Sequence, residues 1–95
     1  VGTLTFEKPD METFRCLALA YEAAKIGHTM PCVLNGANEA AVSLFLHKKL
    51  GFLEIAETLE QVMQMHKVIE NPTLEEILSA DRWAREQVLA LVRQQ

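Results

Sequence analysis

The chain has 95 residues, of which 49% are hydrophobic, and it carries a formal net charge of −4 at neutral pH. These values fit one small domain with a single core, and because the nine basic residues are scattered without interleaved aromatic residues, they do not favour nucleic-acid binding. The apolar runs are far shorter than the ~20 residues that span a bilayer, and no segment resembling a secretory signal opens the chain, so we expect no membrane partner.

The first nine residues alternate apolar and polar side chains, with Leu4 and Phe6 as apolar members. The alternation predicts a short extended leader that lies against another part of the protein. Asp10 can then cap a helix that Gly27 ends. The predicted buried face of this helix has a three-four spacing and consists of Phe14, Leu17, Ala18, Tyr21 and Ala24.

A second helix is predicted from about Gly36 to Leu50, with Gly51 as its stop. Small residues are frequent on its inner face, which implies that a neighbouring helix approaches closely. That face consists of Ala37, Ala40, Ala41, Leu44 and Phe45. A third helix is predicted from about Glu54 to Lys67, and Asn71-Pro72 breaks it.

The segment from Thr73 to Glu76 has the Thr-x-x-Glu form of a capping box, which starts a fourth helical segment. Ser79-Ala80-Asp81 leaves two alternatives open between Leu74 and Gln95, one kinked helix or two helices. Because short loops place successive helices antiparallel, the pattern predicts an all-α fold, an antiparallel four-helix bundle with an extended N-terminal leader.

Two amides and a carboxylate, Asn35, Asn38 and Glu39, stand together at the predicted start of the second helix. Amides at a helix start can hold an anion or a ligand hydroxyl. The structural alternative is that Asn35 is the N-cap, Asn38 bonds the neighbouring backbone and Glu39 complements the helix dipole. The residues alone favour this alternative, because Asn is strongly preferred at caps.

The spacing of the other residues does not indicate a metal site or a nucleotide site. His28 and Cys32 are separated as in some metal sites, but no second close ligand pair accompanies them, so we expect no metal site in this chain. The glycines form neither a G-x-G-x-x-G run nor a P-loop, which argues against a nucleotide site. We expect Cys16 and Cys32 to be reduced core thiols in a cytosolic-type compartment.

Three motifs occur together: Leu4-Thr5-Phe6-Glu7-Lys8-Pro9-Asp10, Arg15-Cys16-Leu17-Ala18-Leu19-Ala20 and Leu34-Asn35-Gly36-Ala37-Asn38-Glu39-Ala40-Ala41-Val42. Together they resemble the carboxy-terminal part of the 1-deoxy-D-xylulose 5-phosphate reductoisomerases, enzymes of the non-mevalonate isoprenoid pathway. Gly36 stands where the family signature more often has Ala, and we expect this position to tolerate small residues. Arg15-Cys16 stands where Pro-Cys is expected.

The resemblance implies that residues 1–10 are the end of an interdomain linker and residues 11–95 a helical C-terminal domain of a larger protein. Such enzymes convert 1-deoxy-D-xylulose 5-phosphate to 2-C-methyl-D-erythritol 4-phosphate with NADPH and Mg²⁺ or Mn²⁺. Their dinucleotide-binding domain and their central catalytic domain, which also forms the homodimer, lie outside the matching segment. By this resemblance the chain itself holds no catalytic, cofactor or metal residue.

The resemblance makes Asn35, Asn38 and Glu39 candidates for contact with the catalytic domain of the same chain. It also implies a cytoplasmic location in a bacterium, or a plastid-type organelle in a eukaryote. The alternative from a different class is a free-standing helical protein-interaction module. The amphipathic leader favours the enzyme domain, because a self-contained module has no need of it.

Overall fold

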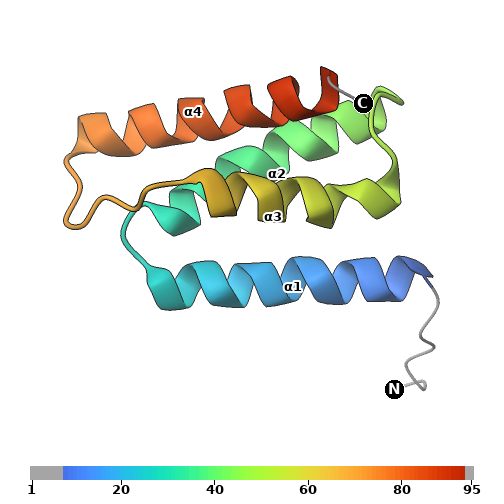
Figure 1. Ribbon diagram of the computed structural model, residues 1–95, viewed down its shortest axis with the longest axis horizontal. Coiled ribbons are helices and arrows are strands. Elements are labelled where there is room, and N and C mark those ends of the chain that lie inside the picture. Colours follow the sequence, from blue (N-terminus) through green and yellow to red (C-terminus); the bar gives the residue numbers. More distant parts are fainter. Residues whose placement is uncertain (1–7, 94–95) are drawn as a thin grey trace.

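The computed structural model describes residues 8–93, and within that range it contains four α-helices, one short 3-10 helix and no strand, so the predicted all-α class is confirmed. The elements are α1 Lys8–Ile26, α2 Met30–Leu46, η1 Phe52–Glu54, α3 Ile55–Met65 and α4 Leu74–Arg93. Each α-helix runs back along its predecessor, which gives the antiparallel bundle (Figure 1). Residues 1–7 of the predicted leader lie outside the described range.

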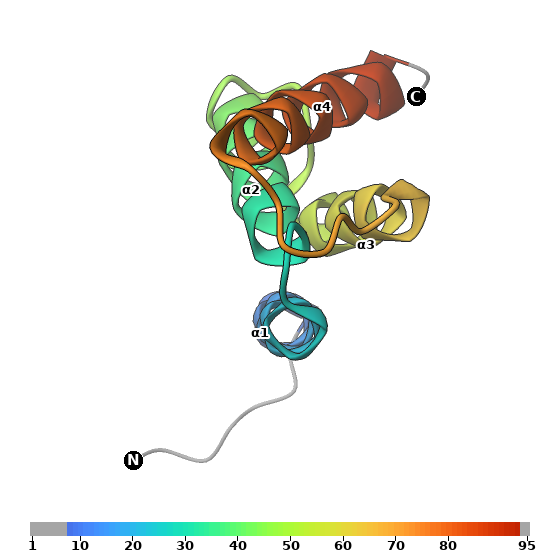
Figure 2. The same cartoon turned by 90° about the vertical axis from the view of Figure 1, so that its left-hand side faces the viewer.

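The central helix is α2, which packs against all three other α-helices. Seen end-on in Figure 2, α1 lies on one side of α2 and α3, and α4 lies on the other. Close packing around α2 follows from small side chains, since Ala37 and Ala41, both predicted on its inner face, are completely buried. The rest of the core comes mainly from α3 and α4: Ile55, Ala56, Leu59, Val62, Met63, Ala80, Ala84 and Val88.

Two of the predicted helix starts are wrong. Asp10 is not a cap, because α1 already includes Lys8 and Pro9, and the first turn is where the missing N–H of proline costs no hydrogen bond. The second helix starts at Met30, six residues before Gly36, with Pro31 in its first turn. Pro31 fits the first turn of α2 because there, too, the missing N–H of proline costs no hydrogen bond.

The predicted helix ends agree in part with the structure. Gly27 ends α1 as predicted: its φ is +71°, and its N–H donates to the Ala23 carbonyl oxygen at 2.9 Å. The end of α2 differs, since the helix stops at Leu46 and Lys48, with φ +60°, takes the left-handed conformation. Gly51 is instead an extended residue that precedes η1.

The capping box at the start of α4 is confirmed. The N–H of Glu76 donates to Thr73 Oγ1 at 3.1 Å, and the N–H of Thr73 donates to Glu76 Oε1 at 2.9 Å. The helix then continues through Ser79, Ala80 and Asp81 to Arg93. Of the two alternatives for this segment, one continuous helix is therefore correct.

The predicted buried face of α1 is turned outward. Leu17 is 59% exposed and Tyr21 78% exposed, and Ala18 and Ala24 are exposed as well. Among residues 10–26 of α1, the buried ones are Leu19, Ala23 and the unexpected Glu12. A three-four apolar spacing exists on two sides of this helix, so the spacing alone does not identify the side that packs on α2 and α3.

Glu12 explains how α1 attaches to the start of α3. Its side chain is buried, and one carboxylate oxygen accepts a hydrogen bond at 2.8 Å from the backbone N–H of Ala56. Ala56 is the second residue of α3, where the backbone N–H has no partner within the helix. Glu12 therefore caps a neighbouring helix and fixes α1 against it.

Candidate functional site

Asn35 and Asn38 lie on α2 beside α1, and both are exposed. They border a groove of about 420 Å³ between these two helices. The other lining residues are mainly apolar and include Leu17, Ala20 and Leu34. Because α2 starts at Met30, Asn35 is in its second turn and is not the N-cap. The capping explanation of Asn35 is therefore wrong.

Glu39 lies on a different side of α2 and contacts α4. Its carboxylate Oε2 accepts from Arg85 Nη2 at 2.9 Å, and Arg85 Nε donates to Asp81 Oδ2 at 3.0 Å. These two hydrogen bonds, first that to Asp81 and then that to Glu39, raise the pKa of Arg85. Glu39 thus links α2 to α4 and does not complement a helix start, although an ion pair this exposed contributes only ~0–1 kcal/mol.

Between the two asparagines, Gly36 lies close to Asp81 of α4. A Cβ atom on Gly36 would lie 2.5 Å from Asp81 Oδ1 and 3.1 Å from the Asp81 carbonyl oxygen. In this chain a residue larger than Gly at position 36 therefore requires Asp81 to shift. The side chain of Asp81 is itself held by Arg85, which limits that shift.

Each of the three histidines has a protein partner. His28 Nδ1 accepts from the Asn71 N–H at 3.4 Å, His47 Nδ1 lies 2.7 Å from the Ser43 carbonyl oxygen, and His66 Nε2 lies 2.7 Å from Thr29 Oγ1. Within residues 8–93, no group of three His, Cys, Asp or Glu side chains is arranged to hold a metal ion.

The two thiols are free and half-buried. Burial is the main cause that raises the pKa of Cys16, and Glu12 nearby adds to it. Burial also raises the pKa of Cys32, whose Sγ donates to the Ile77 carbonyl oxygen at 3.2 Å. Raised pKa values keep both thiols protonated near neutral pH, which is unfavourable for nucleophilic chemistry.

Sequence reasoning missed a polar cluster at the turn before α2. Thr29 is completely buried, and its hydroxyl oxygen accepts from the Ile69 N–H at 3.0 Å while it also pairs with His66. The His66 ring in turn contacts Trp83, with ring centroids 5.2 Å apart. The partners are 37 and 40 residues from Thr29 in sequence, so no local pattern could have indicated this cluster.

None of the helices in the part of the chain that the structure describes has both the length and the apolar composition needed to cross a membrane.

Comparison with known proteins identifies the family. The family model described as the DXP reductoisomerase C-terminal domain matches residues 1–87. The chain belongs to this family. The match favours the domain of a larger enzyme over a free-standing interaction module, and it agrees with the resemblance in the sequence motifs.

Relatives of the DXP reductoisomerase C-terminal domain are full-length enzymes several times longer than this chain. The 1-deoxy-D-xylulose 5-phosphate reductoisomerase of Thermoanaerobacter pseudethanolicus is 61% identical over 85 residues, which cover 90% of this chain and 22% of that protein. The enzyme of Chlorobium limicola is 53% identical over 97% of this chain and 24% of its own length. The chain therefore spans less than a quarter of these relatives.

A solved structure shows the same fold in this family. The 1-deoxy-D-xylulose 5-phosphate reductoisomerase from Zymomonas mobilis in complex with NADPH superposes with a TM-score of 0.74 and 42% sequence identity. The superposition covers 80% of this chain and 20% of the Zymomonas chain. The helical arrangement described above is thus also found within a full-length enzyme.

Proposed function

We propose that this chain serves as the helical C-terminal domain that supports the catalytic domain of a 1-deoxy-D-xylulose 5-phosphate reductoisomerase. The family match over residues 1–87 carries this proposal. The full-length protein converts 1-deoxy-D-xylulose 5-phosphate to 2-C-methyl-D-erythritol 4-phosphate for isoprenoid synthesis, as a homodimer in the bacterial cytoplasm or, in a eukaryote, in a plastid-type organelle.

NADPH and a divalent cation, Mg²⁺ or Mn²⁺, belong to the rest of this enzyme in the proposal. NADPH supplies the hydride and the cation supplies electrophilic assistance when they are bound. The described residues carry no arrangement of ligands for the cation. The only glycine with a left-handed φ among them is Gly27, which ends α1 and opens no phosphate-binding loop. In this proposal the role of this chain is support and positioning.

The decisive test is the activity of the full-length protein that contains this chain. We expect consumption of NADPH, followed by its absorbance, when 1-deoxy-D-xylulose 5-phosphate and Mn²⁺ are both present. Omission of either one should abolish the signal. A folded full-length protein that leaves NADPH unchanged in the complete mixture would refute the proposed activity.

Asn35, Asn38 and Glu39 are proposed to form part of the contact with the catalytic domain. Asn35 and Asn38 support this most directly, because their amides are exposed beside an apolar groove. Glu39 lies on the neighbouring side of α2, and its side chain is still 55% exposed in its ion pair with Arg85. Polar groups at the edge of an apolar surface are typical of the rim of a contact between protein surfaces.

The contact can be tested with Asn38→Ala in the full-length enzyme, with Gln61→Ala as control because Gln61 is an exposed amide on α3 that does not line the groove. Loss of Asn38 should leave a buried partner unsatisfied, at a cost of ~1–3 kcal/mol. We expect modestly weaker turnover and substrate affinity for Asn38→Ala. Gln61→Ala should leave both unchanged. Complete inactivity of folded protein would indicate direct catalysis, and unchanged kinetics and stability would exclude the contact.

A further inference from the structure

The outer face of α1 carries large apolar side chains that are exposed. We define this face by Phe14, Leu17, Ala18 and Tyr21, which line a broad hollow of about 790 Å³ along the helix. Phe14 is 42% exposed, Leu17 59% and Tyr21 78%. Continuous apolar surface of this kind on a small domain marks a place where another surface binds.

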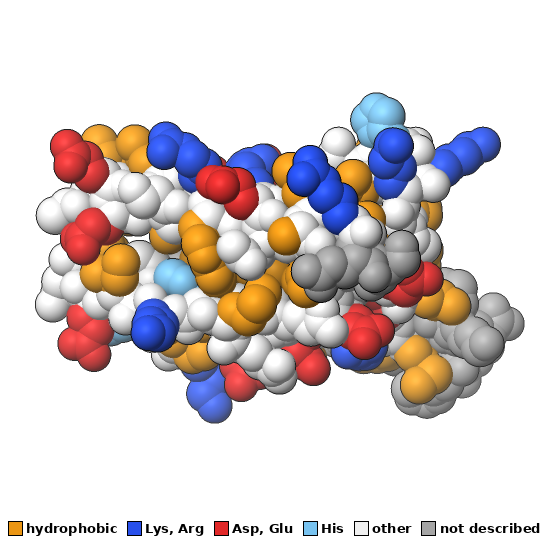
Figure 3. Space-filling model, turned by 45° about the horizontal axis from the view of Figure 1, so that its top comes forward, with side chains coloured by type: hydrophobic (Ala, Val, Ile, Leu, Met, Phe, Trp, Pro, Cys, Tyr) orange, Lys and Arg blue, Asp and Glu red, His pale blue; other side chains and the backbone are white. Residues whose placement is uncertain are grey.

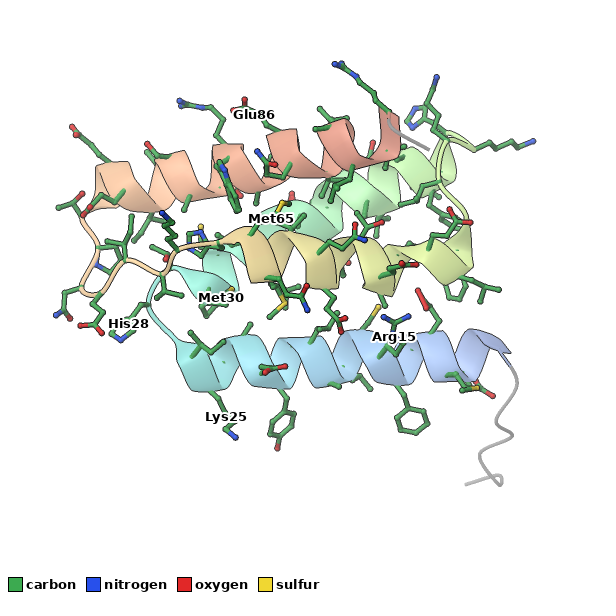
Figure 4. All side chains as sticks on the ribbon, viewed as in Figure 1. Arg15, Lys25, His28, Met30, Met65 and Glu86 are labelled. Carbon is green, nitrogen blue, oxygen red and sulfur yellow. The ribbon has the colours of Figure 1, made fainter. Side chains whose placement is uncertain are left out.

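Charges are confined to one end of the outer face of α1. Glu22 and Lys25 are the charged residues that line the hollow, and Figure 4 shows Lys25 pointing away from the other helices. By contrast, over α4 in Figure 3 the apolar side chains are interspersed with Lys, Arg, Asp and Glu. Depletion of charge at the centre with charge at the edge is the composition of a protein–protein interface.

The helix α1 is apolar on two opposite sides. Leu19 and Ala23 face the interior of the domain, whereas Leu17 and Tyr21 face outward. A helix that is apolar on more than one side is typical of a position between two packed layers. Within residues 8–93, α2 and α3 form one of those layers, and the outward side of α1 is open to a second.

The lengths of the relatives indicate what that second layer is. The chain spans 22–24% of the relatives' length, and the matching family is described as a C-terminal domain, so most of each relative's polypeptide precedes the matching segment. The helix α1, which starts at Lys8, is the first helix of the described residues. Among the four α-helices, α1 is thus the one nearest in sequence to the larger part of the protein.

We propose that the outer face of α1 is the surface on which the preceding part of the same polypeptide docks. This inference rests on the proposed function, because it takes the larger part of a reductoisomerase as the occupant. The groove that contains Asn35 and Asn38 adjoins this face, since Leu17 lines both hollows. The apolar face contributes the centre of the contact, and the two amides contribute its polar rim.

Tyr21 provides a direct probe, because it is the only tyrosine of the chain and is 78% exposed in the domain itself. Hydroxyl-radical labelling of the full-length protein, read by mass spectrometry of the Tyr21 peptide, measures whether that ring is covered. We expect slow labelling in the parent protein. In Leu17→Glu the labelling rate should rise about tenfold or more, which corresponds to about 1.4 kcal/mol of lost docking free energy.

Leu74→Glu is the matched control, since Leu74 is 70% exposed on α4, away from the outer face of α1. We expect Tyr21 to stay protected in this variant. Rapid labelling of Tyr21 in the parent protein, or equal unmasking by both variants, would overturn the assignment to α1. Protection that disappears on dilution would also overturn it, because a second copy would then be the occupant.

The labelling result and the enzyme assay separate the two proposals. If the full-length protein consumes NADPH and Tyr21 is labelled rapidly, the proposed activity is supported and the docking face is refuted. If the protein is inactive, but Tyr21 is protected and becomes accessible only in Leu17→Glu, the docking face is supported and the proposed activity is refuted.

Discussion

Replacement of Thr29 by Val tests whether the buried polar cluster holds the turn before α2 to the segment after α3. Thr29 has 0% exposure, and its hydroxyl group bonds Ile69 N–H at 3.0 Å and His66 Nε2 at 2.7 Å. Valine has nearly the same shape and removes both bonds without opening a cavity. The free energy of unfolding should therefore report the polar interactions themselves.

The magnitude follows from the two bonds that Thr29→Val removes. Each intramolecular hydrogen bond contributes ~1 kcal/mol, so their loss costs ~2 kcal/mol. The extra methyl group returns up to ~0.8 kcal/mol of apolar burial. Because Ile69 and His66 are partly exposed, water can also replace some of the hydrogen bonds that they lose. We expect a net loss of about 1–2 kcal/mol.

Thr58→Val is a matched control in urea denaturation of the 95-residue chain. Thr58 is also buried, at 2% exposure, but its hydroxyl donates only to the Glu54 carbonyl oxygen one helical turn earlier. We expect a change near zero for Thr58→Val and a midpoint about 1 M urea lower for Thr29→Val, at an m-value of ~1–2 kcal/mol/M. Equal midpoints for the two variants would refute the reasoning, because the long-range bonds would then contribute nothing.

Three further predictions concern stability. Thr73→Ala should lower the free energy of unfolding by ~1 kcal/mol, because it removes the acceptor for the Glu76 N–H, and an unchanged denaturation midpoint would contradict this. Burial lowers the pKa of His66, so the unfolded chain binds the proton at higher pH than the folded chain does. The contribution of neutral His66 to the free energy of unfolding should therefore be fully present above pH ~6.5 and be lost as the pH falls through the folded pKa. His66→Gln should flatten that part of the profile in thermal unfolding at a series of pH values. Gly36→Val should cost ~1–3 kcal/mol by calorimetry, because a Cβ meets Asp81, and a rise in melting temperature would contradict the close approach.

Two predictions from local chemistry, the capping box of α4 and the end of α1, agreed with the structure, whereas the predicted caps at Asp10 and Asn35 did not. The capping box needs only Thr73 and Glu76, and the end of α1 needs only the left-handed conformation that Gly27 takes readily. The start of α2 was wrong because Pro31 fits a loop as well as a first helical turn. The prediction of the buried side of α1 was wrong because the choice depends on what α2 and α3 offer, which no local pattern contains.

The polar run in α2 shows why the candidate site was only partly predictable. The sequence suggested a helix start at this run, because amides and carboxylates are unfavourable inside an apolar helix. The run consists of Asn35, Gly36, Asn38 and Glu39. The helix instead continues through them, and each position meets a different neighbour: the asparagines border the groove beside α1, Gly36 contacts Asp81, and Glu39 binds Arg85. A central helix that packs on three others has no single polar face, so its polar residues are divided among its neighbours. Only Asn35 and Asn38 then lie beside an apolar groove, which is why the proposed contact with the catalytic domain depends on them more than on Glu39.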